Sequence, residues 1–117
     1  MGLTMTYDPF SIIIVPFPFT DKLRTKRRPA LVLSSTHHQK ETSHITLLMI
    51  TSAKHSHWKS DHPIEQLQVT GLTSPSMVRQ KLFTIDSRLI IQQLGYLASQ
   101  DVKEVKKILI SHLAIKQ

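Results

Sequence analysis

The stretch SIIIVPFPF, residues Ser11–Phe19, indicates the fold class of this chain of 117 residues. Its isoleucines and valine are β-branched, and such short apolar runs favour a β-strand. Pro16 and Pro18 lack backbone N–H donors, which predicts a strand at a sheet edge or a barrel rim. PALVLS at Pro29–Ser34 is typical of a second strand, and Thr20–Arg28 between them is polar. The two strands are therefore expected to form a hairpin with a long basic tip.

Further along the chain, three stretches have the composition of strands. His44–Thr51 (HITLLMIT) is the most apolar and is expected to be buried. Ile64–Thr70 alternates less cleanly, while Met77–Ile85 (MVRQKLFTI) holds one or two short strands. Polar or turn-forming segments separate these stretches: His37–Ser43, Lys54–His62 and Gly71–Ser76. Asp86–Leu97 places apolar residues on one side of a short helix that Gly95 would end.

The C-terminal part has the pattern of an amphipathic helix. Ser99 is a suitable N-cap, and Asp101 lies in the first turn, where the helix dipole favours an anion. One apolar stripe runs along this segment: Val102, Val105, Ile108, Leu109 and Leu113. The sequence therefore predicts a mainly β (α+β) fold, in which a small closed or half-closed β-barrel carries a C-terminal helix. A single domain over residues 1–117 is expected from the length.

The composition limits the classes of function. Fifteen Lys and Arg residues against eight Asp and Glu give a net charge of +7, which points to a polyanion such as nucleic acid or to an anionic membrane face. The absence of cysteine excludes disulfides, zinc–thiolate sites and thiol catalysis. No apolar run reaches the ~20 residues of a membrane span, and the first one is interrupted by prolines, unlike a signal peptide. A cytoplasmic protein without membrane contact is expected.

Five cations lie at the tip of the first hairpin: Lys22, Arg24, Lys26, Arg27 and Arg28. Such a loop can follow a phosphodiester backbone, although a solvated hairpin tip has the same composition. Arg28 differs from the others because it precedes Pro29, which favours an extended backbone. It therefore begins the second strand, and a guanidinium on a rigid element is well placed for chemistry.

Other polar residues have two interpretations each. Thr51 and Ser52 close the third strand, where hydroxyls can bind a phosphate oxygen or a sugar hydroxyl, or simply end the strand. Trp58 can stack on an unpaired base or anchor its loop on the barrel. Arg79 and Lys81 alternate along one strand and extend the positive face if they point with Arg28.

The histidines near residue 60 could form a metal site, but their spacing argues against it. His55 and His57 would share a face of a strand, and Asp61 with His62 could complete a site. Their spacing matches no strong zinc signature, and the segment has the composition of a loop. A neutral histidine near a phosphate could instead act as a general base. We expect neither a metal nor a cofactor.

Five segments in order resemble the PemK/MazF family of toxin endoribonucleases. They are VPFPFTD (Val15–Asp21), KRRPALVLSS (Lys26–Ser35), LLMITSA (Leu47–Ala53), GLTSPSMVRQKLFTID (Gly71–Asp86) and LIIQQLGYL (Leu89–Leu97). The resemblance runs from about Asp8 to Leu113, which is nearly the whole chain. It implies an SH3-like barrel of the CcdB-like type with a C-terminal helix, assembled as a homodimer.

The resemblance also implies a function. Members of the family cleave single-stranded RNA, usually mRNA, and are neutralised by a cognate antitoxin. Attack by the 2′-OH, without a metal, would leave a 2′,3′-cyclic phosphate and a 5′-OH. The family's arginine before the RP pair falls on Arg28, and its threonine falls on Thr51 with Ser52 beside it. The remaining RNA-binding candidates are Lys22, Arg24, Lys26, Arg27, Lys54, Trp58, Arg79 and Lys81.

The chain departs from the family pattern in two places. Pro9-Phe10-Ser11 replaces the usual Gly-Asp, and Gln80 stands nearest to an acid that some members carry. Two alternatives also remain. A gyrase-inhibiting toxin of the same fold would need an aromatic residue at the extreme C-terminus, whereas this sequence ends Ala114-Ile115-Lys116-Gln117. A barrel that only binds nucleic acid would bind RNA and DNA alike with steep salt dependence.

Overall fold

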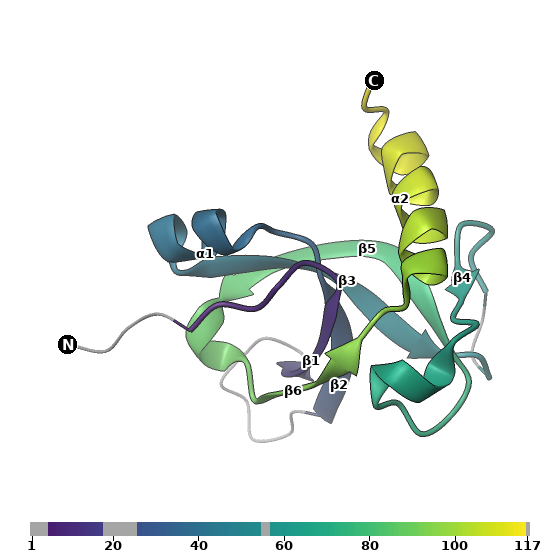
Figure 1. The fold of residues 1–117 in the computed structure, drawn as a ribbon, viewed down its shortest axis with the longest axis horizontal. Helices are drawn as coiled ribbons and strands as arrows, with labels where there is room; N and C mark the ends of the chain where they lie inside the picture. Colours follow the sequence, from purple (N-terminus) through teal and green to yellow (C-terminus); the bar gives the residue numbers. More distant parts are fainter. Residues whose placement is uncertain (1–4, 18–25, 55–56, 117) are drawn as a thin grey trace.

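The computed structural model describes residues 5–17, 26–54 and 57–116. These residues form six strands in one antiparallel sheet of order β4-β5-β3-β2-β1-β6, which curls into a half-barrel (Figure 1). The strands are β1 (Ser11–Phe17), β2 (Lys26–Val32), β3 (His44–Ser52), β4 (His62–Pro63), β5 (Ser76–Asp86) and β6 (Gln92–Tyr96). The helices are α1 (Thr36–Thr42) and α2 (Ser99–Leu113), with 3₁₀ turns η1 (Leu67–Thr70) and η2 (Ser87–Leu89). The expected mainly β half-barrel with a C-terminal helix is confirmed.

The first hairpin forms as the sequence predicts. β1 and β2 pair with Val15 opposite Arg28, and β2 begins at Lys26, three residues before the expected Pro29. β5 is one long strand rather than two short ones, paired with β3 and broken only by a bulge beside Leu48. Residues 18–19 of the expected first strand and residues 20–25 of the expected basic tip lie outside the described residues.

Both faces of the curled sheet are covered, which explains its long apolar runs. Neighbouring residues of β1, β2 and β3 enter two separate core clusters. Ile12 and Leu31 belong to the first cluster, which also receives Val105 from α2. Ile13 and Ala30 belong to the second cluster. Full burial of an isoleucine or leucine contributes about 1.5–3 kcal/mol to the free energy of unfolding, so both clusters hold the strands in register.

The prediction of a strand over Ile64–Thr70 is wrong. β4 is a two-residue strand that precedes this segment, and Leu67–Thr70 is a 3₁₀ turn. The backbone N–H groups of Glu65 and Gln66 donate to the carboxylate of Asp101 and are thus unable to pair with another strand. A side chain from far along the sequence therefore decides the local backbone.

The prediction of a short helix within Asp86–Leu97 is also wrong. One 3₁₀ turn follows β5, and then Gln92–Tyr96 forms the edge strand β6 against β1. This segment pairs with the open edge of β1, and that pairing replaces the helix that its apolar residues would also fit. Gly95 packs directly against the backbone of Val69. A side chain at this position would not fit, since an added Cβ would lie 2.4 Å from the Val69 carbonyl oxygen.

The two helices lie well apart on the sheet (Figure 1). α1 occupies most of the segment 37–43 that was expected to be only a polar connection, and the Ser35 hydroxyl caps it by accepting from the His38 N–H at 3.1 Å. Among the described residues, no helix is both long and apolar enough to cross a membrane.

The C-terminal helix confirms the first part of the predicted apolar stripe, but Leu113 at the end of the stripe is 42% exposed and the predicted cap is wrong. Val105 is buried, and Val102 and Leu109 pack on the first core cluster. Ala98, not Ser99, has the N-cap backbone geometry, because the strand hydrogen bonding continues through Leu97, whose N–H donates to the Phe10 carbonyl at 2.9 Å. Asp101 lies in the first turn as expected, but it is wholly buried.

Candidate active site

A pocket of about 420 Å³ opens where β2 and β3 approach the segment before β5. It collects three chemical groups from segments far apart in the sequence. The cations come from β2: Lys26, Arg27 and Arg28. The hydroxyls come from β3, from the segment before β5 and from the first residue of β5: Thr51, Ser52, Thr73, Ser74 and Ser76. The apolar residues are Ile14, Pro29, Ile50, Leu72 and Leu94.

The sequence-predicted residues Arg28 and Thr51 both line this pocket. The pairing of β2 with β3 ends at Ala30 and Met49, so Arg28 and Thr51 each lie two residues beyond the last pair of these two strands. A guanidinium beside a hydroxyl can bind two oxygens of one phosphate group, because both donate hydrogen bonds. The arrangement is suited to a phosphodiester.

The Arg28 guanidinium is fixed in place but not fully satisfied. Its Cζ lies 5.5 Å from the centroid of the Phe17 ring, and the Nζ of Lys81 lies 6.0 Å from the same ring. Phe17 in turn meets Phe83 edge to face, with centroids 5.8 Å apart. Arg28 Nε is buried and has no hydrogen-bond partner among the described residues. A buried donor without a partner costs free energy, and a ligand oxygen would relieve that cost.

The other predicted residues of the third strand have different surroundings. Ser52 lines the pocket, and its hydroxyl oxygen also accepts from the Lys54 N–H at 3.2 Å, so it helps to form the turn after β3. Lys54 is exposed and does not line the pocket. Lys22 and Arg24 lie outside the described residues.

Trp58 and Arg79, predicted separately, form one unit with Asp61, which the sequence analysis did not assign to them. The Arg79 guanidinium donates to both carboxylate oxygens of Asp61, at 3.1 and 2.9 Å, and its Cζ lies 4.7 Å from the Trp58 ring centroid. Burial alone would raise the pKa of Asp61, but Arg79 and the Trp58 N–H outweigh it and lower that pKa. No local signal marks this pair, because 18 residues separate Asp61 from Arg79.

The residues considered for a metal site bind other partners. His57 Nε2 contacts the Ala53 carbonyl at 3.0 Å, His62 contacts Asp101, and Asp61 contacts Arg79. No group of three or more potential metal ligands occurs within residues 5–17, 26–54 and 57–116. His55 lies outside these ranges.

Gln80, the residue nearest to the acid of some relatives, is not among the residues that line the pocket. It is 5% exposed, and its Oε1 accepts from Nδ1 of His112 on α2 at 2.9 Å. The second departure from the family pattern is Pro9-Phe10-Ser11. Within it, Phe10 has φ = 67°, in the left-handed region that glycine adopts readily. The position of the family's Gly-Asp is therefore strained here.

A family model described as "PemK-like, MazF-like toxin of type II toxin-antitoxin system" matches residues 8–113. The chain belongs to this family. The match spans every strand and helix described above, and it includes each residue that lines the pocket.

Solved structures of MazF proteins share the fold of this PemK/MazF-family chain. MazF from Deinococcus radiodurans superposes with a TM-score of 0.75 at 20% identity, over 95% of this chain and 99% of that one. Mycobacterium tuberculosis toxin MazF-mt6 gives 0.73 at 21% identity, over 92% and 99%. A mycobacterial endoribonuclease in complex with its cognate antitoxin gives 0.73 at 9% identity, over 100% and 99%. A comparison with curated protein sequences finds no significant match.

Proposed function

We propose that this PemK/MazF-family protein is an endoribonuclease toxin that cleaves single-stranded mRNA at selected sequences. The observation that carries the proposal is that Arg28 and Thr51 line one pocket, and that the buried Arg28 Nε lacks a hydrogen-bond partner among the described residues. Family membership supports the same reaction, since a structural neighbour of the same fold is an endoribonuclease.

The proposed reaction needs no metal. The 2′-oxygen of one nucleotide forms a bond to the adjacent phosphorus as its proton leaves, and the bond from phosphorus to the 5′-oxygen breaks as that oxygen gains a proton. The products are a 2′,3′-cyclic phosphate and a 5′-OH. DNA lacks the 2′-OH and should bind without being cut.

Arg28 and Thr51 have distinct roles in this mechanism. The Arg28 guanidinium stabilises the negative charge that accumulates on the phosphoryl oxygens and can donate a hydrogen bond to the leaving 5′-oxygen. An arginine stays protonated at neutral pH and is therefore a poor general base. Thr51 binds a phosphate oxygen or orients the 2′-OH, and Ser52 lies next to it at the pocket edge.

Several cations and one aromatic ring would hold the RNA around this centre. Lys26 and Arg27 line the pocket, and Lys81 lies beside the ring that also contacts Arg28. Trp58 is 43% exposed, so part of its surface is available for a base to stack on. Lys22, Arg24 and Lys54 are proposed to add to the positive surface along the RNA. Arg79, predicted as a fourth such cation, is 14% exposed and paired with Asp61, so we propose that it contributes by holding Trp58.

A cognate antitoxin is the proposed protein partner. Two of the structural neighbours are described as complexes, an endoribonuclease with its antitoxin and MazE-MazF from Deinococcus radiodurans. A chain with a net charge of +7 can be neutralised by an acidic partner segment. We also propose that the toxin is a homodimer and acts in the cytoplasm, where mRNA is translated.

The test is to incubate the purified protein with a long mixed-sequence single-stranded RNA in excess EDTA and to map the fragment ends. Discrete cuts with 2′,3′-cyclic phosphates and 5′-OH ends are expected, while single-stranded DNA of the same sequence stays intact. Fragments with 5′-phosphates would contradict the mechanism. Salt-sensitive binding without any cutting would instead identify a barrel that only binds nucleic acid.

A further inference from the structure

One wall of the pocket comes from the segment 71–76, which contains neither a helix nor, before Ser76, a strand. This wall is nevertheless fixed by direct backbone contact with β6. Gly71 has φ = 78°, and a Cβ there would lie 2.6 Å from the Leu94 carbonyl oxygen. A Cβ at Gly95 would lie 2.4 Å from the Val69 carbonyl oxygen. Both glycines allow an approach that no side chain would permit.

Hydrogen bonds hold both ends of this wall. The Thr70 hydroxyl donates to the Leu67 carbonyl at 2.6 Å and accepts from the Leu72 N–H at 3.1 Å. At the other end, the Ser76 hydroxyl donates to the Ser74 carbonyl at 2.9 Å. The Ala53 N–H donates to the Pro75 carbonyl at 3.1 Å, which connects the wall to the end of β3.

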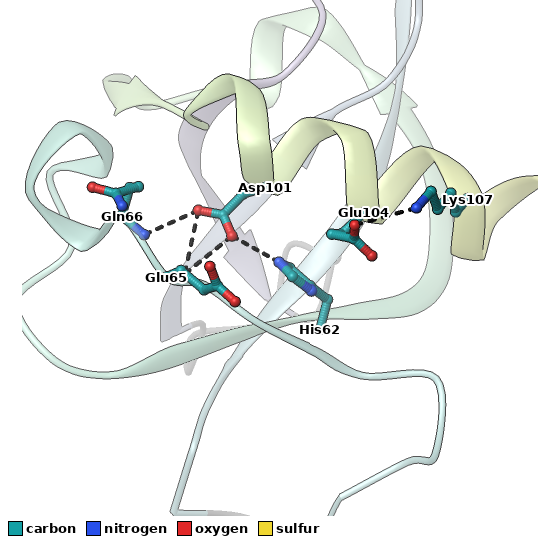
Figure 2. A network of polar contacts seen from close by, with 6 residues as sticks. All are labelled: His62, Glu65, Gln66, Asp101, Glu104 and Lys107. Carbon is teal, nitrogen blue, oxygen red and sulfur yellow. Dashed lines mark hydrogen bonds and ion pairs between the residues drawn. The ribbon is translucent and has the colours of Figure 1, made fainter.

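A buried carboxylate fixes the chain just before the wall (Figure 2). Asp101 of α2 is fully buried and accepts from the backbone N–H groups of Glu65 and Gln66, at 3.1 and 3.0 Å. Its third partner is His62, whose Nε2 lies 2.7 Å from the carboxylate. The segment that leads into the pocket wall is thus held against α2 as well as β6.

Thr73 and Ser74 lie on this rigid wall and line the pocket. Both residues are exposed, and neither side-chain hydroxyl takes part in a hydrogen bond with another described residue. The pocket's cations come from β2 and suit the phosphate backbone, which carries no sequence information itself. A hydroxyl both donates and accepts, so it can pair with the edge of a base.

We propose that Thr73 and Ser74 are specificity-determining residues, whose hydroxyls bind the base edge of the nucleotide next to the cleaved phosphodiester. The inference rests on the proposed function and deepens it, because it names the part of the pocket that reads the sequence. Reading a base requires donors and acceptors at fixed positions, and the contacts of Gly71, Gly95 and Asp101 supply that rigidity. The pocket volume of about 420 Å³ falls within the range of small-ligand sites.

The test compares Thr73→Val, Ser74→Ala and the double variant with wild type. Ser111→Ala, an exposed hydroxyl on α2 outside this pocket, is the matched control. Each protein is given a random single-stranded RNA pool, whose cleavage sites are sequenced, and a random single-stranded DNA pool, whose bound molecules are sequenced. Thermal unfolding shows whether the variants remain folded, and unchanged midpoints are expected because both side chains are exposed.

We expect wild type and Ser111→Ala to prefer the same sequence. At one position of that sequence, the double variant should lose about tenfold in preference in both pools, as expected for losing a base hydrogen bond. An unchanged preference in the double variant, or no preference in wild type, would overturn the inference. If wild type cuts no RNA but the DNA preference still shifts, the proposed cleavage fails and the base-reading wall stands. If wild type binds neither pool, both fail.

Discussion

Arg28 of β2 and Thr51 of β3 each lie two residues beyond Ala30 and Met49, the last residues that pair these neighbouring strands. Both line the same pocket, although 23 positions of sequence, from 28 to 51, separate them. Residues from several other segments line the pocket as well, among them Ile14, Gly71 and Leu94. Each can therefore be tested by substitution without removing the pocket.

Thr51→Val should reduce the rate of RNA cleavage while leaving the fold intact. Valine keeps the shape and the strand preference of threonine but lacks the hydroxyl. Loss of one hydrogen bond made in the transition state corresponds to roughly a tenfold lower rate. Single-turnover cleavage is the measurement, with Thr51→Ser as the control that keeps the hydroxyl and most of the rate. A wild-type rate for Thr51→Val would remove Thr51 from the mechanism.

Asp61→Asn should loosen the unit that holds Trp58. The Asp61 carboxylate is 2% exposed and Arg79 14% exposed, so the substitution leaves a largely buried guanidinium without its charged partner. Removing one partner of a buried pair costs about 3 kcal/mol in the free energy of unfolding. Trp58 is the only tryptophan, so its fluorescence reports the change directly. An emission spectrum identical to that of wild type would show that the ion pair does not position the ring.

Acid should destabilise the protein through Asp101. Burial alone would raise the pKa of Asp101, but hydrogen bonds from the Gln66 N–H, His62 and the Glu65 N–H outweigh it and lower the pKa below its ordinary value of 3.8. The ionised carboxylate therefore stabilises the folded state above the ordinary pKa. This contribution is lost as the pH falls below about 4 and through the lower pKa of the folded state.

Asp101→Asn should lower the free energy of unfolding at pH 7 by about 3 kcal/mol and weaken its dependence on pH below 4. Urea unfolding at a series of pH values measures both effects. Asp8→Asn, at an exposed carboxylate, is the control and should match wild type. If Asp101→Asn kept the wild-type slope in acid, other carboxylates would be responsible.

Phe10→Gly should be more stable than Phe10→Ala by about 1 kcal/mol, which reverses the usual order for these residues. Both lose the ring, which packs on the first core cluster and lies 5.5 Å from the Lys106 Nζ. Only glycine relieves the strain at φ = 67°. Thermal or urea unfolding of the two variants gives the comparison. Greater stability of the alanine variant would show that the backbone there is not strained.

The sequence predicts the first three strands and the place of Arg28 on the second of them because these signals are local. β-branched runs indicate β1 and β3, and the Arg28-Pro29 pair indicates that Arg28 stands on a strand. The Asp61–Arg79 and His62–Asp101 pairs could not be predicted, since 18 and 39 residues separate their members.

Contacts between residues far apart in the sequence also explain the two wrong predictions of secondary structure. Ile64–Thr70 is not a strand because Asp101 binds two of the N–H groups that a strand would use. Gln92–Tyr96 is a strand because the open edge of β1 lies beside it, which local periodicity does not reveal. The wall that carries Thr73 and Ser74 was expected to be only a turn, and its place in the pocket depends on contact with β6.

The most direct test of the proposed active site is the single-turnover cleavage rate of Arg28→Ala against that of Arg27→Ala, in EDTA and with both variants shown to be folded. The two arginines are adjacent, both line the pocket, and only Arg28 has the buried Nε without a partner among the described residues. The account predicts at least a hundredfold loss for Arg28→Ala, as is typical for removing a donor to the developing charge, and a small loss for Arg27→Ala. Cleavage by Arg28→Ala at the wild-type rate would contradict it.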